Sequence, residues 1–179
     1  FGMIQNQTER LSHLSEVLLD MTGIQSVERS DSISLAELTD EVCCDLASIA
    51  DQKKVELIQE EGDCTVTGSY LLLYRAVYNL VENAIKYNHS GGKVTVKISQ
   101  KKDLPAAHSK PTDYALVEVT DTGIGISPEF QEKIFDPFFR VDKSRSRAMG
   151  GAGLGLALVN EIARQHGGQV KVLASSEQG

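Results

Sequence analysis

Hydrophobic and polar positions follow two different periods along this chain, and each period predicts a set of elements. Apolar residues recur every three to four positions in four segments, which predicts helices over residues 1–22, 35–51, 69–88 and 153–166. In six shorter segments they recur every second position, which predicts strands over residues 32–34, 55–60, 64–67, 93–99, 114–120 and 169–174. A further short helix is expected over residues 127–135, because Ser-Pro-Glu is typical of a helix start.

The first predicted helix differs from the others. Its apolar residues Ile4, Leu11 and Leu18 lie seven positions apart. Further apolar positions make the apolar face wider than the stripe of a two-stranded coiled coil, so the pattern favours a helical bundle. The polar stretch 25–31 reads as a linker. We therefore expect two parts, a bundle helix over residues 1–24 and a globular domain over residues 32–179.

The composition of the chain excludes some binding partners and some cellular locations. The net charge of −7 argues against a nucleic-acid surface, so no nucleic-acid partner is expected. No apolar stretch approaches the roughly 20 residues of a membrane span, and the polar N-terminal stretch does not resemble a signal peptide. Three cysteines, two of them adjacent, fit a reducing compartment. These features predict a cytoplasmic segment, and leave open a membrane anchor elsewhere in the parent protein.

The most informative single stretch is 121–126, Asp-Thr-Gly-Ile-Gly-Ile, which follows a predicted strand. Its two glycines let a flat ligand approach the backbone closely. The Asp121 carboxylate can only accept hydrogen bonds, and the exocyclic amine of adenine is a matching neutral donor. An ordinary Asp-x-Gly hairpin turn is the alternative.

The predicted helix 69–88 carries Asn79, Asn83 and Lys86 at positions i, i+4 and i+7, which places them on one face. Carboxamide oxygens suit Mg²⁺, which also takes ligands from phosphates and water. The lysine supplies a point charge for phosphate oxygens. A polar stripe on a solvated helix is the alternative.

Segment 140–152 is basic and rich in glycine at its end, which favours a mobile lid over a phosphate site; the alternative is a merely solvated run of charge. Phe135, Phe138 and Phe139 precede it and are expected to be hydrophobic anchors. The helix that follows has free N–H groups at its start, where phosphate binds. A dinucleotide-binding fingerprint fails here, because Leu156 occupies the third glycine position and no strand precedes the glycines.

Four segments in this order, 79–88, 121–126, 135–140 and 150–156, resemble the N, G1, F and G2 boxes of sensor histidine kinases. That family shares its ATP-binding fold with gyrase, heat-shock ATPase chaperones and mismatch-repair ATPases. The resemblance covers about residues 11–179. It implies an α/β two-layer sandwich of the Bergerat type, in which three helices cover one face of a mixed, mostly antiparallel sheet, with the N-terminal bundle helix appended. The family's final strand is expected to be absent.

The resemblance also implies the site. Asn83 would be the principal Mg²⁺ ligand and a catalytic residue with Lys86, while the neighbouring Glu82 is a candidate general base. The residues that would bind the nucleotide are Asn79, Asn83, Lys86, Tyr87, Asp121, Gly123, Gly125, Ile126, Phe138, Arg140, Lys143, Arg145, Gly151, Gly153, Leu154, Gly155 and Leu156.

The implied reaction is transfer of the γ-phosphoryl of ATP to a histidine, and from it to an aspartate of a response regulator. None of His13, His89, His108 and His166 has the acidic residue and proline that follow the family's phosphoacceptor. The acceptor histidine is therefore expected on a helix outside this chain, in the same or a partner subunit, with a homodimeric parent protein. Alternatives are a hydrolytic ATPase of the same superfamily, which usually carries an acid at position 79, and a non-catalytic ATP-sensing or dimerisation module.

Overall fold

The predicted alternation of helices and strands is present in the computed structural model, which describes residues 23–103, 112–141 and 153–175. The bundle helix expected over residues 1–22 lies outside the described residues. The elements in chain order are η1 (Ile24–Ser26), β1 (Asp31–Ser34), α2 (Leu35–Lys53), β2 (Glu56–Gln59), β3 (Thr65–Gly68), α3 (Tyr70–Lys86), β4 (Lys93–Asp103), β5 (Thr112–Asp121), η2 (Pro128–Phe130), η3 (Lys133–Phe135) and α5 (Gly155–Gln165).

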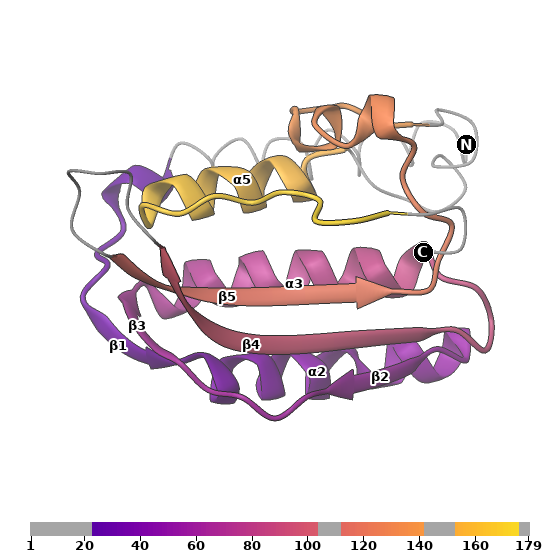
Figure 1. Cartoon of the computed structure of the whole chain (residues 1–179), viewed down its shortest axis with the longest axis horizontal. Helices are drawn as coiled ribbons and strands as arrows, with labels where there is room; N and C mark the ends of the chain where they lie inside the picture. The colour runs from indigo at the N-terminus through magenta and orange to yellow at the C-terminus, as the bar shows by residue number, and fades with distance from the viewer. Residues whose placement is uncertain (1–22, 104–111, 142–152, 176–179) are drawn as a thin grey trace, which may run out of the picture.

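The strands form two sheets; α2 and α3 lie against one face of the larger sheet, and α5 packs on α3 (Figure 1). In the larger sheet β2 runs parallel to β4, and β4 pairs with β5 antiparallel, from Val94 opposite Asp121 to Asp103 opposite Thr112. β1 and β3 form a separate antiparallel pair. The predicted α/β sandwich with a mixed, mostly antiparallel sheet is thereby confirmed.

Helix α3 is central because it is apolar on two sides. Val81 and Ile85 belong to a core shared with α2 and the sheet, and Leu72 and Ala76 belong to a second core shared with α5. Burial of this kind contributes roughly 25 cal/mol per Å² of apolar surface, so both neighbours fix the position of α3. Neither α2, α3 nor α5, the α-helices of the described residues, is long and apolar enough to cross a membrane.

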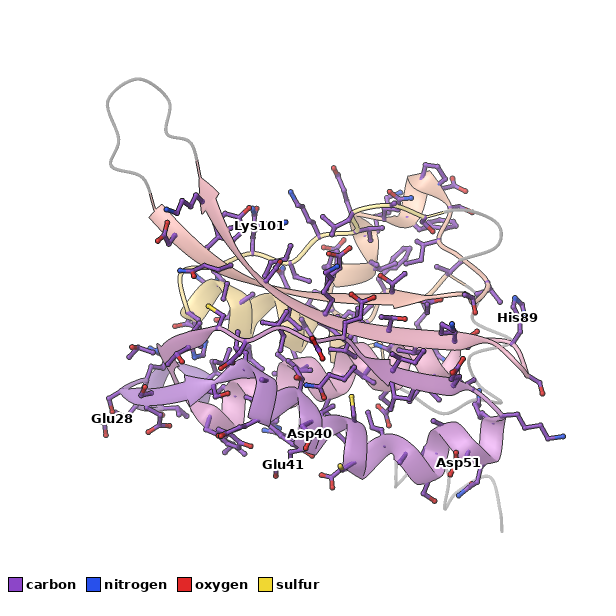
Figure 2. All side chains as sticks on the ribbon, turned by 60° about the horizontal axis from the view of Figure 1, so that its bottom comes forward. Glu28, Asp40, Glu41, Asp51, His89 and Lys101 are labelled. Atoms are coloured by element: carbon purple, nitrogen blue, oxygen red, sulfur yellow. The ribbon has the colours of Figure 1, made fainter. Side chains whose placement is uncertain are left out.

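A row of tyrosines on α3 also joins it to α2. Tyr70 donates a hydrogen bond to Glu41, and Tyr74 donates one to Asp45. The bond to Glu41 raises the pKa of Tyr70 to about 12, and burial together with Asp45 raises the pKa of Tyr74. Figure 2 shows Glu41 on the outer side of α2, so these pairs join the two helices at their solvent-facing side.

Two of the predicted secondary-structure elements are not formed in the structure. The helix expected over residues 127–135 is wrong: there are two 3₁₀ turns, η2 and η3, and the Ser127 side chain makes no capping bond. A stretch this short, followed by Pro137, cannot extend the nucleus of an α-helix. The strand expected over residues 169–174 is also wrong, because this segment forms no ladder with any described strand.

His166, just after α5, ties the end of that helix to the start of α3. The Ser69 N–H donates to Nε2 at 3.1 Å, and Nδ1 lies 2.8 Å from the Ile162 carbonyl oxygen. Since a carbonyl only accepts and a backbone N–H only donates, Nδ1 carries a hydrogen and Nε2 is the acceptor. Gly68 makes room, because a Cβ there would lie 2.7 Å from the His166 ring.

His166→Ala should therefore lower the free energy of unfolding by about 1–3 kcal/mol, because the buried N–H of Ser69 loses its acceptor. Urea denaturation would measure this. His89→Ala is the matched control, since His89 is exposed at the edge of the molecule (Figure 2) and its loss should cost less than about 0.5 kcal/mol. Equal losses in both variants would show that the His166 contacts do not stabilise the fold.

Candidate functional site

Asp121 is the last residue of β5, and the turn after it folds against the end of α3. Its Oδ1 accepts the Gly123 N–H at 2.8 Å, and the Ile124 N–H donates to the Tyr87 carbonyl oxygen at 3.2 Å. Gly123 is required for this approach, because a Cβ would lie 2.5 Å from the same carbonyl oxygen. No described residue donates to Asp121 Oδ2, so the half-buried carboxylate keeps one acceptor oxygen for a ligand.

The turn then continues through Gly125, whose φ of 68° lies in the left-handed region that glycine adopts readily. The Ile126 N–H donates to Ser175 Oγ at 2.7 Å, and Gln131 donates to the Ile126 carbonyl at 3.1 Å. Both contacts fix the far end of the turn. Ser175 was not predicted from the sequence, since a contact across 49 positions leaves no periodic signal.

Asn79 and Asn83 both face the first residue of α5. A Cβ on Gly155 would lie 2.6 Å from Asn79 Oδ1 and 4.0 Å from Asn83 Nδ2. Asn79 Nδ2 donates to the Arg75 carbonyl at 2.8 Å, so only its oxygen faces this space. The shared face predicted from the i, i+4 spacing is confirmed for these two residues.

The start of α5 also leaves donors beside them. Leu154, its N-cap, is buried and makes no side-chain capping bond. The first N–H groups of a helix have no partner within the helix, and they carry a partial positive charge. The Asn79 carboxamide oxygen and these N–H groups thus lie together, a combination that suits a metal-bound phosphate.

Two cationic side chains, Lys86 and Arg140, complete the site. Burial lowers the pKa of Lys86; Glu82 opposes this effect, and the charges of Arg140 and Lys53 add to it. Arg140 Nη2 is buried and has no hydrogen-bond partner among the described residues. A buried guanidinium donor without an acceptor costs free energy, so the pair fits a multiply charged anion such as a nucleotide phosphate.

Gly153 positions Arg140. Its φ is 74°, and a Cβ would lie 3.1 Å from Arg140 Cγ and 2.8 Å from the Phe139 carbonyl oxygen. The Phe138 N–H donates to the Gly153 carbonyl at 2.9 Å, which joins the two ends of the intervening segment. The aliphatic part of Arg140 therefore packs directly on the glycine backbone.

The structure places the remaining predicted residues in different ways. The prediction of Phe138 as a hydrophobic anchor is wrong, because this residue is 53% exposed, whereas Phe139 packs on Phe130 with ring centroids 5.7 Å apart. Glu82 interacts electrostatically with Lys86 and Tyr78, and its role stays a prediction. Tyr87 is half-buried, and the Lys86 Nζ lies over its ring, 5.4 Å from the ring centroid. Leu156 is half-buried on α5. The others lie outside the described residues: Lys143, Arg145 and Gly151.

The chain is similar in sequence and in fold to known proteins. A family model described as "Histidine kinase-, DNA gyrase B-, and HSP90-like ATPase" matches residues 68–179. Sensor histidine kinase RppB of Synechocystis sp. is 32% identical over 98% of this chain and 38% of its own length. Sensor-like histidine kinase SenX3 of Mycolicibacterium smegmatis is 33% identical over 93% of this chain and 42% of its own. The structure of mycobacterial sensor histidine kinase MprB has a TM-score of 0.60 and 29% identity, covering 77% of this chain and 80% of MprB.

The chain therefore belongs to the histidine kinase-, DNA gyrase B- and HSP90-like ATPase family. Within that family its relatives are sensor histidine kinases, and it is an ATP-binding domain of the sensor histidine kinase type. The family predicted from the four sequence segments is confirmed. The chain spans less than half the length of the curated relatives it matches.

Proposed function

We propose that this domain binds ATP with Mg²⁺ and transfers the γ-phosphoryl group to a histidine on another helix, from which it passes to an aspartate of a response regulator. The observation that best supports transfer chemistry is the pair of half-buried cationic residues Lys86 and Arg140, of which Arg140 packs on Gly153 just before α5. Phosphoryl transfer requires mainly positioning and charge neutralisation, and these groups provide both.

In this proposal the adenine amine donates to Asp121, whose second oxygen is held by Gly123. Lys86, Arg140 and the N–H groups at the start of α5 bind the phosphates. Glu82 is proposed as the general base, because it lies one helical turn from Lys86 on the same helix.

The proposed Mg²⁺ ligand is the carboxamide oxygen of Asn83, with Asn79 assisting. Mg²⁺ takes few protein ligands, prefers oxygen, and completes its shell with phosphates and water. When bound, it would neutralise charge that develops on the phosphate oxygens. The neutral asparagines would hold the metal without adding negative charge near the phosphates.

The proposed arrangement in the parent protein follows from the family. Residues 1–24 would form the second helix of a dimerisation hairpin, and residues 32–179 the catalytic domain. The acceptor histidine would lie on the first helix, in the same or the partner subunit of a homodimer. The proposed location is the cytoplasm, where ATP is available, with the parent protein anchored in the membrane.

The proposal is tested by mixing this chain with Mg-ATP labelled at the γ-phosphate and a separate hairpin that carries a family phosphoacceptor histidine. Acid-labile phosphate should appear on the hairpin, and the chain should not label itself. Arg140→Ala should reduce transfer strongly, whereas Arg164→Ala, which removes an exposed arginine on α5, should not. Release of free phosphate without transfer would identify a hydrolytic ATPase instead.

A further inference from the structure

We propose that Asn88 and Thr122 are positioning residues that hold the adenine end of the site at a fixed distance from its phosphate end. The inference rests on the proposed function. Neither side chain is placed in contact with the nucleotide. They act through the backbone of Lys93, the first residue of β4, which both of them contact.

The contacts form a compact junction of three segments. Thr122 Oγ1 accepts the Lys93 N–H at 2.9 Å, and Asn88 Nδ2 donates to the Lys93 carbonyl at 2.9 Å. The Thr122 backbone N–H donates to the same carbonyl at 3.1 Å. Thr122 Oγ1 also lies 3.2 Å from Asn88 Oδ1, where its hydroxyl can donate. Each polar group of the two side chains is therefore used to bind a neighbouring segment.

Gly92 leaves the space in which this junction forms. A Cβ there would lie 2.1 Å from Asn88 Oδ1 and 2.8 Å from Thr122 Oγ1. Real Cβ atoms do not approach oxygen atoms so closely, so any larger residue must separate the two side chains. The glycine is needed here for room and not for its backbone angle, since its φ is outside the positive range.

The position of the junction in the chain gives it a role. Asn88 comes two residues after Lys86, and Thr122 comes directly after Asp121. Helix α3 carries the groups proposed for phosphate and metal, whereas β5 carries the group proposed for adenine. The junction therefore joins the phosphate half of the site to the adenine half, and it lies no more than two residues in sequence from Lys86 and from Asp121.

ATP contains both ligand parts at a fixed covalent separation. ATP binds more tightly than adenosine only if the site contacts the adenine and the phosphates at the same time, as in any bivalent interaction. A pre-organised spacing lowers the cost of binding. Loosening the junction should therefore reduce the advantage of ATP over adenosine while leaving the adenosine contacts at Asp121 nearly intact.

The test measures the dissociation constants of Mg-ATP and adenosine for Thr122→Val, which keeps the shape and removes the hydroxyl. We expect Mg-ATP to bind about tenfold more weakly and adenosine less than about threefold more weakly. Thr122→Ser should restore the wild-type ratio within about twofold. Thr120→Val is the matched control, because Thr120 is exposed on β5, two residues before Thr122, and the same change there should alter neither constant.

A second variant, Gly92→Ala, disturbs the junction without removing a polar group and should lower the ratio in the same direction. Gly168→Ala is its control, since a Cβ there makes only an ordinary contact at 3.5 Å. A ratio unchanged in both Thr122→Val and Gly92→Ala, or equal weakening of the two ligands, would overturn the inference. If the wild type binds ATP and Asp121→Asn weakens that binding, either of these results refutes only the positioning role of Asn88 and Thr122. If the wild type binds no ATP, the proposed function is wrong as well.

Discussion

Asp121→Asn should weaken ATP binding by about 2–4 kcal/mol, a thirtyfold to thousandfold rise in the dissociation constant, because a half-buried hydrogen bond to a charged group is lost and replaced by a repulsive contact. The structure gives the reason why asparagine cannot simply turn its amide round. The Gly123 N–H requires an acceptor at 2.8 Å, so the single amide oxygen stays there. The amide NH₂ then faces the adenine amine, and two donors oppose each other.

Isothermal titration calorimetry would measure this loss, and circular dichroism would show whether the fold survives. Asp113→Asn is a matched control, since Asp113 is exposed on the same strand and carries the same functional group. Its affinity should equal that of the wild type. An unchanged affinity in Asp121→Asn would refute the assignment of adenine to this turn.

Asn83→Ala should abolish the effect of Mg²⁺ on ATP binding and reduce phosphoryl transfer by at least about a hundredfold, because a metal ion supplies several kcal/mol of charge stabilisation to such reactions. Adenosine should bind as before, since its proposed contacts lie on the Asp121 turn. Asn83→Asp should also abolish transfer, because it places a negative charge beside the phosphates.

The control for this variant is Asn160→Ala, which removes an exposed carboxamide from α5. Its transfer rate should match that of the wild type in the hairpin assay. Normal transfer by Asn83→Ala would mean that the metal is held by other residues.

The parts of the site that lie within one element could be predicted from the sequence. Asn79 and Asn83 share a face because helical geometry places residues four apart on the same side, and both do face Gly155. Asp121 was expected at a strand end, and β5 ends there. In each case the signal is local, so it does not depend on how the elements pack.

The parts that depend on distant contacts could not be predicted. Lys53 donates to the Lys86 carbonyl at 2.6 Å across 33 positions, and nothing in the periodicity around either residue indicates it. The junction of Asn88 and Thr122 spans 34 positions and was missed for the same reason. Side-chain to backbone bonds of this kind are decided by tertiary packing.

The two incorrect elements have the same origin. Residues 169–174 alternate as a strand should, but a ladder forms only where a neighbouring strand offers free backbone groups. Residues 127–135 have the residues of a helix start and too little chain to continue it. A pattern indicates what a segment favours, and its neighbours decide whether that preference is realised.

The most direct test of the nucleotide site is a four-way comparison of affinity, with ATP and adenosine each measured in the presence and absence of Mg²⁺. In the wild type, Mg²⁺ should tighten ATP binding and leave adenosine binding unchanged. In Asn83→Ala, ATP should bind equally with and without the metal, and adenosine should bind as in the wild type. If Asn83→Ala weakened adenosine and Mg-ATP by the same factor, Asn83 would be a structural residue, and the proposed division into an adenine end at Asp121 and a metal-phosphate end at Asn83 would be wrong.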